Sequence, residues 1–116
     1  MTYLDYLKET GCDVEGALKR LNRNADFYRT LLRHLIKDTN LKELIEVFGK
    51  YDLTESFNKA HTLKGVLANL GIIPYYEKIS LIIVDLKENN LEGVDFLIQD
   101  FDKEYTEFIT GLEKLL

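Results

Sequence analysis

The C-terminal part of the chain carries apolar side chains at a spacing that strongly constrains its fold. Six of these residues step along the sequence by four, four, three, four and three positions: Leu97, Phe101, Tyr105, Phe108, Leu112 and Leu115. A helix of 3.6 residues per turn places all six on one face, whereas a strand would divide them between two faces. The spacing therefore predicts a helix that packs through one apolar seam sustained over about five turns.

Residues that commonly begin helices precede several other stretches with the same apolar spacing. The predicted start positions are, in order, Thr2 with Asp5, Asp13, Asn24, Asn40 with Glu43 as a capping box, and Asp52 with Glu55 or else Thr54. Gly49 is expected to help end one helix. Gly71 is expected to end the next in a left-handed conformation, and Pro74 then begins another.

The segment PYYEKISLIIVDLKENN, residues 74–90, is ambiguous because SLIIVDL also has the composition of a buried strand. Its apolar residues Ile79, Ile82, Ile83 and Leu86 keep helical spacing, and the segment is long for a strand. We therefore predict a helix here.

These helices predict an all-α fold. The four C-terminal helices, joined by short loops, are expected to form an antiparallel up-down-up-down four-helix bundle, with the additional short N-terminal helices packed across one end or side. The chain has a single proline and no glycine- or serine-rich linker, so we predict one domain over residues 1–116.

Composition excludes several classes of function. Fifteen basic and twenty acidic residues give a net charge of −5, which argues against nucleic acid as the main partner because phosphate binding needs a concentrated basic face. The longest apolar run is four residues, at 81–84, so no membrane span is expected. The first residues lack a signal-peptide pattern, and Cys12 is the only cysteine, which favours a reducing, cytoplasmic location.

The stretch AHTLKGVLANLG, residues 60–71, contains the candidate functional residues. At about 100° per residue, the apolar positions of this helix lie together, and His61 lies on the opposite, outward face. The same outward face holds Phe57, Lys64, Gly65 and Ala68. Glycine inside a helix costs about 1 kcal/mol relative to alanine, so Gly65 indicates the close approach of a bulky partner to the backbone.

The chemistry open to His61 is limited by its neighbours. Most exposed histidines have no special role, but an isolated imidazole beside a lysine and a glycine can act as a nucleophile. No further ligands at helical spacing accompany His61, so no metal or other cofactor is expected on this chain. The sequence shows no nucleophile paired with a general base, so it does not indicate a hydrolase. A neutral imidazole can attack a phosphoryl group, and Lys64 can neutralise the charge that develops on its oxygens.

The residues His61-Thr62-Leu63-Lys64-Gly65, with Gly71 six positions later, resemble the H-x-L-K-G-x5-G motif of histidine-containing phosphotransfer (HPt) domains. Upstream, RLNRNADFYRTLLRHLIKD is similar to the helix that precedes the bundle in this family. Including the hairpin that extends to about Asn90, the resemblance covers about two-thirds of the chain.

The resemblance implies a phosphorelay carrier of two-component signal transduction. His61 would accept a phosphoryl group on Nε2 from the aspartyl phosphate of a response-regulator receiver domain and pass it to another receiver. Lys64 would stabilise the phosphoryl group, Gly65 and Ala68 would give the receiver clearance, and Phe57 and Thr62 would belong to the docking surface. The catalytic aspartates and Mg²⁺ would be supplied by the receiver, so the chain would not be an enzyme. A hybrid histidine kinase is a further expected partner, and we expect a monomer.

The sequence departs from the family pattern at two places. Val66 stands where a small residue is common, and we expect it to flank His61 and to alter partner preference. The facing helix offers Ile79, Ile83 and Val84 at the level of His61, where family members often have a polar side chain. Two other functions stay open: a receiver-docking module without phosphotransfer, and the phosphoacceptor domain of a chemotaxis-type kinase.

Overall fold

The structure, a computed structural model, describes all 116 residues and is entirely helical, without strands, as the sequence predicted. Its seven helices are α1 (Tyr3–Glu9), α2 (Val14–Arg20), α3 (Ala25–Ile36), α4 (Asn40–Gly49), α5 (Leu53–Asn69), α6 (Ile73–Lys87) and α7 (Leu91–Glu113). The ambiguous segment around SLIIVDL belongs to α6, so the helical prediction for it is confirmed.

Most of the predicted helix starts are confirmed. Thr2 and Asp5 form a reciprocal capping box at α1, while Asp13, Asn24 and Asp52 each accept a hydrogen bond at the start of their helices. The predicted capping box of Asn40 and Glu43 is wrong. Asn40 is already helical, and its backbone N–H donates to Oδ1 of Asp38 at 2.8 Å, so the preceding aspartate satisfies this end instead.

The last four helices are joined by three-residue connections of one geometry. The central residue of each is left-handed: Tyr51 with φ 59°, Gly71 with φ 72° and Asn89 with φ 58°. The backbone N–H of each central residue donates three positions back, and the next N–H donates five positions back, which is the Schellman pattern. Gly71 therefore ends α5 as predicted. Gly49 is the last residue of α4 but is not left-handed, because Tyr51 takes that position.

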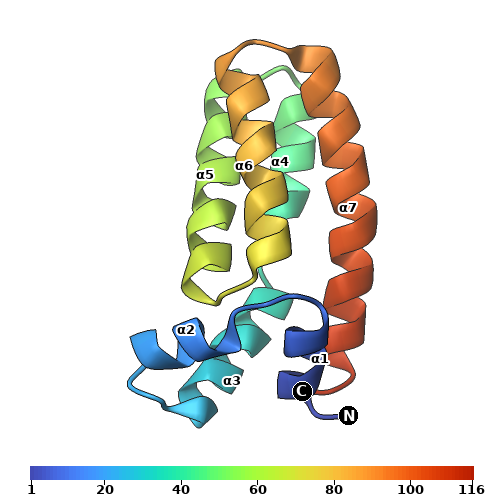
Figure 1. Cartoon of the computed structure of the whole chain (residues 1–116). Coiled ribbons are helices and arrows are strands. Elements are labelled where there is room, and N and C mark those ends of the chain that lie inside the picture. Colours follow the sequence, from blue (N-terminus) through green and yellow to red (C-terminus); the bar gives the residue numbers. More distant parts are fainter.

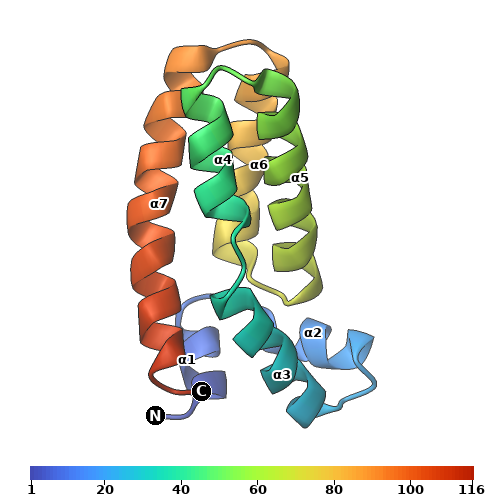
Figure 2. The ribbon, with the colours of Figure 1, turned by 180° about the vertical axis from the view of Figure 1, so that it is seen from behind.

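Helices α4 to α7 lie side by side along the long direction of the molecule, whereas α1, α2 and α3 lie at one end (Figure 1). The view from behind shows α4 between α5 and α7 (Figure 2). Each of these four helices packs against the next in sequence. The molecule measures 40 × 25 × 21 Å along its principal axes.

Hydrogen bonds from two tyrosine hydroxyls and one backbone N–H attach the N-terminal helices to α7 and to the connection between α5 and α6. The Tyr6 hydroxyl donates to the Phe108 carbonyl of α7 at 2.8 Å, and the buried Tyr28 hydroxyl donates to the Leu70 carbonyl at 2.8 Å. The Asp13 N–H donates to the Gly71 carbonyl at 2.7 Å. A Cβ at residue 71 would collide with the Asp13 backbone, so glycine is needed here for close approach as well as for conformation.

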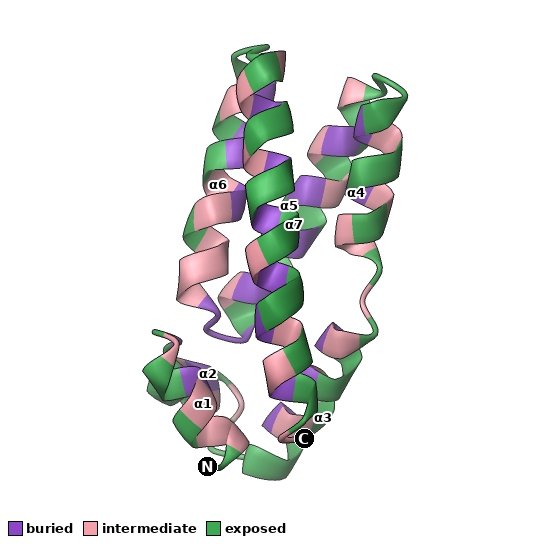
Figure 3. Cartoon of the chain, turned by 90° about the vertical axis from the view of Figure 1, so that its right-hand side faces the viewer, coloured by how far each residue is buried: buried purple, intermediate pink, exposed green.

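Buried residues recur along the facing sides of the helices (Figure 3). They include four of the six residues of the C-terminal seam, Phe101, Tyr105, Phe108 and Leu112, whereas Leu97 and Leu115 are partly buried. On α5 the buried stripe comprises Ser56, Ala60, Leu63 and Leu67. The opposite side of α5 is thereby left facing solvent.

Candidate functional site

His61 is exposed on the outer face of α5, as its position relative to the apolar stripe predicted. Asp52 fixes the start of this helix by accepting from the Glu55 N–H at 3.1 Å. No side chain hydrogen-bonds the His61 imidazole. Both ring nitrogens are therefore free to meet solvent or a partner.

Phe57 lies one turn before His61, and the two rings are close. Their centroids are 5.8 Å apart with planes inclined by 33°. Phe57 is partly buried against the core, so it supports one side of the imidazole rather than standing free on the surface. The ammonium of Lys87, from the last turn of α6, lies 5.6 Å from the centroid of the Phe57 ring on α5.

Lys64 lies one turn after His61 and is partly buried. Its Nζ is 5.4 Å from the centroid of the Tyr76 ring on α6, a cation–π arrangement that favours a fixed position for the ammonium. Neither Lys64 nor Lys87 takes part in any ion pair of the chain. Two ammonium groups without an ion pair thus lie against the rings of Tyr76 and Phe57, and Phe57 in turn lies beside His61.

Gly65 is exposed, and a Cβ added to it would meet nothing within 4 Å. Other helical glycines differ: a Cβ at Gly93 would collide with Asp85 and Asn90, and one at Gly111 with Tyr6. Packing within the chain therefore accounts for Gly93 and Gly111 but gives no reason for Gly65.

The remaining predicted site residues are near the same stretch of α5 but contribute differently. Thr62 is exposed, and its hydroxyl donates to the Asn58 carbonyl at 2.9 Å. Ala68 is partly buried, and its carbonyl accepts from the Arg20 guanidinium at 2.9 Å. Arg20 also donates twice to the Asn69 carbonyl, at 3.2 and 3.1 Å, so α2 satisfies the C-terminal end of α5.

The residues expected to face His61 from α6 divide into two groups. Ile79 and Ile83 are buried in the core, whereas Val84 is 47% exposed. Val66 is partly buried and lines a cleft with Leu31 and Leu35 of α3. None of these residues places a polar group at the imidazole.

Two residues of the site were missed by sequence reasoning, Lys87 and Tyr76. Both lie on α6, so no spacing within the α5 motif could indicate them. Counting equal distances outward from Gly71 along both helices does not find them either, because it pairs Lys64 with Lys78 and Phe57 with Asp85.

Few other side chains of the chain are arranged to bind a metal ion or to react. No group of three or more histidine, cysteine, aspartate or glutamate side chains is arranged to hold a metal ion. Cys12 is a free thiol in the core, where burial raises its pKa, and a raised pKa makes a thiol less reactive. No helix has both the length and the apolar character needed to cross a membrane.

Comparisons with protein-family models, with curated proteins and with solved structures gave no match to this chain.

Proposed function

We propose that this chain is a phosphorelay carrier of the HPt type, which receives a phosphoryl group on His61 from the aspartyl phosphate of one receiver domain and passes it to another. The observation that carries the proposal is the surface around His61. An exposed imidazole with no internal hydrogen bond lies one turn from an open glycine, and the ammonium groups of Lys64 and Lys87, which form no ion pair, lie against the neighbouring rings of Tyr76 and Phe57.

Phosphoryl transfer requires few groups from this chain. A lone pair on the unprotonated ring nitrogen attacks phosphorus in line, the N–P bond forms, and the bond from phosphorus to the aspartyl oxygen breaks. The carboxylate leaves with the bonding pair, and the other ring nitrogen keeps its proton. Charge on the phosphoryl oxygens is met by Lys64 and Lys87. The receiver supplies Mg²⁺ and its own acidic residues, so this chain is a carrier rather than an enzyme.

The same proposal assigns the helices an architecture and a location. Helices α4 to α7 form an up-down-up-down four-helix bundle, supported by their three-residue connections and by the packing of each helix against the next. We place the protein in the cytoplasm, where receiver domains act, as a monomeric single domain.

Docking requires a partner to come close to α5. Gly65 leaves its backbone uncovered, and Ala68 adds only a methyl group one turn on. Phe57 and Thr62 supply an apolar and a polar contact on either side of the imidazole. A receiver loop that carries the phosphorylated aspartate fits this surface because His61 is exposed and Gly65 leaves the backbone one turn away uncovered.

The direct test uses phosphorylated receivers with Mg²⁺ and the purified chain. We expect label on the chain that is acid-labile and base-stable, and loss of this label in His61→Gln. The matched control is His34→Gln, which removes the only other histidine, an exposed residue on α3. Absence of label with several receivers, or label that persists in His61→Gln, would overturn the proposal. Receiver binding without label would instead support a docking module.

The role of the two lysines is tested separately. We expect Lys64→Gln and Lys87→Gln each to slow transfer by about 10-fold or more, since each removes a cation that meets the transferred group. Lys103→Gln is the control, because Lys103 is exposed on α7 and takes part in no ion pair. Equal rates in all three variants would show that the ammonium groups have no part in transfer.

A further inference from the structure

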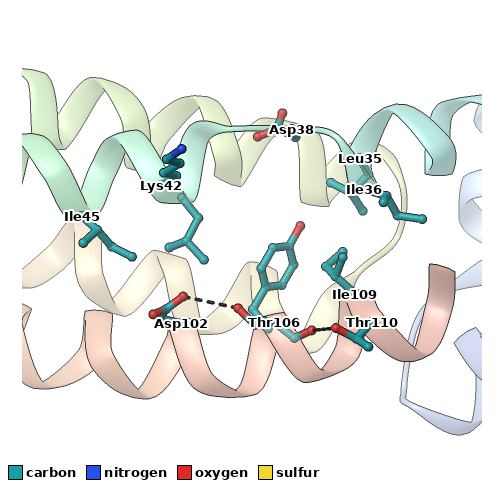
Figure 4. A pocket seen from close by; sticks show the side chains of 11 residues that line it. Leu35, Ile36, Asp38, Lys42, Ile45, Asp102, Thr106, Ile109 and Thr110 are labelled. Atoms are coloured by element: carbon teal, nitrogen blue, oxygen red, sulfur yellow. Dashed lines mark hydrogen bonds between the residues drawn. The ribbon is translucent and has the colours of Figure 1, made fainter.

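A cleft of about 320 Å³ lies between the α3–α4 region and α7. Figure 4 shows its labelled walls: Leu35 and Ile36 come from α3, Asp38 from the connection, Lys42 and Ile45 from α4, and these face residues of α7. None of the residues proposed for phosphotransfer lines this cleft. Its volume falls within the range of small-molecule sites.

Tyr105 lines the cleft and is the unusual residue in it. Its side chain belongs to the core with only 6% of the residue exposed, yet its hydroxyl has no hydrogen-bond partner. An unsatisfied buried hydroxyl costs roughly 1–3 kcal/mol, which a partner in the cleft would recover. The hydroxyls of Tyr6, Tyr28 and Tyr75, in contrast, all donate to backbone carbonyls.

Among the neighbouring polar side chains, the two threonines and Asp38 already have partners inside the chain, and Lys42 is exposed to solvent. The Thr106 hydroxyl donates to Asp102, and the Thr110 hydroxyl donates to the Thr106 carbonyl (Figure 4). Both carboxylate oxygens of Asp38 accept from Asn40, at 2.8 and 3.0 Å, which fixes this carboxylate beside the cleft while leaving each oxygen a free lone pair. Tyr105 is thus the group that needs an external partner.

The chemistry of that partner follows from what surrounds Tyr105. Burial, and next the negative charge of Asp38, raise the pKa of Tyr105, so its hydroxyl stays protonated and needs an acceptor. An ammonium group has no lone pair to accept with. A carboxylate would be repelled by Asp38 and Asp102, which outnumber the single ammonium of the lining, Lys42. A hydroxyl group can accept from Tyr105 and also donate to Asp38. The aliphatic walls, including Ile45 and Ile109, require an apolar body.

We propose that this cleft binds a small uncharged aromatic alcohol, with its hydroxyl against Tyr105 and its ring against the aliphatic side chains of α3, α4 and α7. A single ring fits the volume, and the ring of Tyr105 favours aromatic contact. A bound water could also satisfy the hydroxyl, but it would leave the aliphatic walls uncovered. The inference is independent of phosphotransfer at His61.

The test is an NMR titration of the full chain with p-cresol, with toluene and p-toluate as comparison compounds. We expect saturable shifts at the methyl groups of Ile45 and Ile109. Toluene, which lacks the hydroxyl, should bind roughly 3- to 10-fold more weakly than p-cresol, the range that one hydrogen bond provides. The p-toluate anion should bind more weakly than p-cresol because the lining holds two carboxylates, Asp38 and Asp102, and only one ammonium, Lys42.

Variants then separate hydroxyl recognition from simple apolar binding. Tyr105→Phe keeps the ring and should fold at least as well, because the deleted hydroxyl has no partner. It should remove the preference for p-cresol over toluene. Tyr75→Phe, whose hydroxyl donates to the Glu104 carbonyl outside the cleft, should retain that preference. The proposal fails if p-cresol produces no saturable shifts, if toluene binds equally well, or if Tyr105→Phe keeps the preference.

Discussion

Gly65 allows the stability and the function of one position to be measured separately. It lies inside α5, it is exposed, and its added Cβ would meet no atom within 4 Å. Gly65→Ala should therefore gain the full difference in helix propensity, about 1 kcal/mol, with no loss from packing. At about 2.1 cal/mol/K per residue, the unfolding entropy of a 116-residue chain is about 0.24 kcal/mol/K, so the melting temperature should rise by about 4 °C.

At the same position, a substitution that stabilises the helix is expected to slow phosphoryl transfer. Gly65→Gln should also stabilise the helix, by less than alanine, but its side chain would stand over the surface where we propose that the receiver docks. Thermal unfolding by circular dichroism measures the first effect. The rate of phosphoryl transfer from a phosphorylated receiver, at subsaturating concentration, measures the second. We expect a more stable protein that transfers more slowly.

A matched control is available at Gly49, the last residue of α4. A Cβ there also meets nothing within 4 Å, but Gly49 lies outside the predicted docking surface. Gly49→Ala should leave transfer unchanged. If Gly65→Gln transfers as fast as the wild-type chain, the clearance argument is refuted. If Gly65→Ala is no more stable than wild type, the position is not open as the structure shows.

Two further predictions concern the fold. Tyr51 is 75% exposed and left-handed with φ 59°. Tyr51→Gly should therefore raise the free energy of unfolding, measured in urea, by about 0.5–1 kcal/mol. Asn89→Gly should raise it by less, because asparagine tolerates the left-handed conformation. A gain at Asn89 as large as that at Tyr51 would contradict this explanation. Burial raises the pKa of Tyr75 to about 12 from an ordinary value of 10.0, so the unfolded chain loses this proton first and stability should fall as pH rises from about 10 to about 12. Tyr75→Phe should make the urea midpoint less dependent on pH in this interval, and an unchanged dependence would exclude Tyr75 as a contributor.

The outward face of α5 was accessible from the sequence because helical geometry is local. Once Leu63 and Leu67 define the buried side, the direction of His61 follows from 100° per residue, without knowledge of any other helix. The absence of a packing reason for Gly65 was not accessible in this way. It required the positions of all atoms around residue 65.

The residues that complete the site come from another helix. Lys87 reaches Phe57, and Tyr76 supports Lys64, only because α5 and α6 pack together in one register. That register is set by the connection at Gly71 and by core packing, which depend on contacts far apart in sequence. The same limit applies to Tyr105. Its apolar spacing predicted burial, but only the assembled α3, α4 and α7 show that its hydroxyl lacks a partner.

At the two ends of α4, the residues that usually begin or end a helix do not take all of their usual positions. Gly49 is the last residue of α4, as expected, but the left-handed position that follows is taken by the exposed Tyr51 rather than by a glycine. Asn40 was expected to cap α4, but Thr39 is the N-cap residue and Asp38 accepts from the Asn40 N–H.

The sequence by itself thus determined the helices, most of their starts and the face on which His61 lies, because each depends on periodicity and on capping within a few residues. Tertiary structure decided which side chains of α6 contact Lys64 and Phe57, why Gly71 must approach Asp13, and where a buried hydroxyl is left without a partner. These properties depend on the register between helices, and that register is the result of packing the whole core.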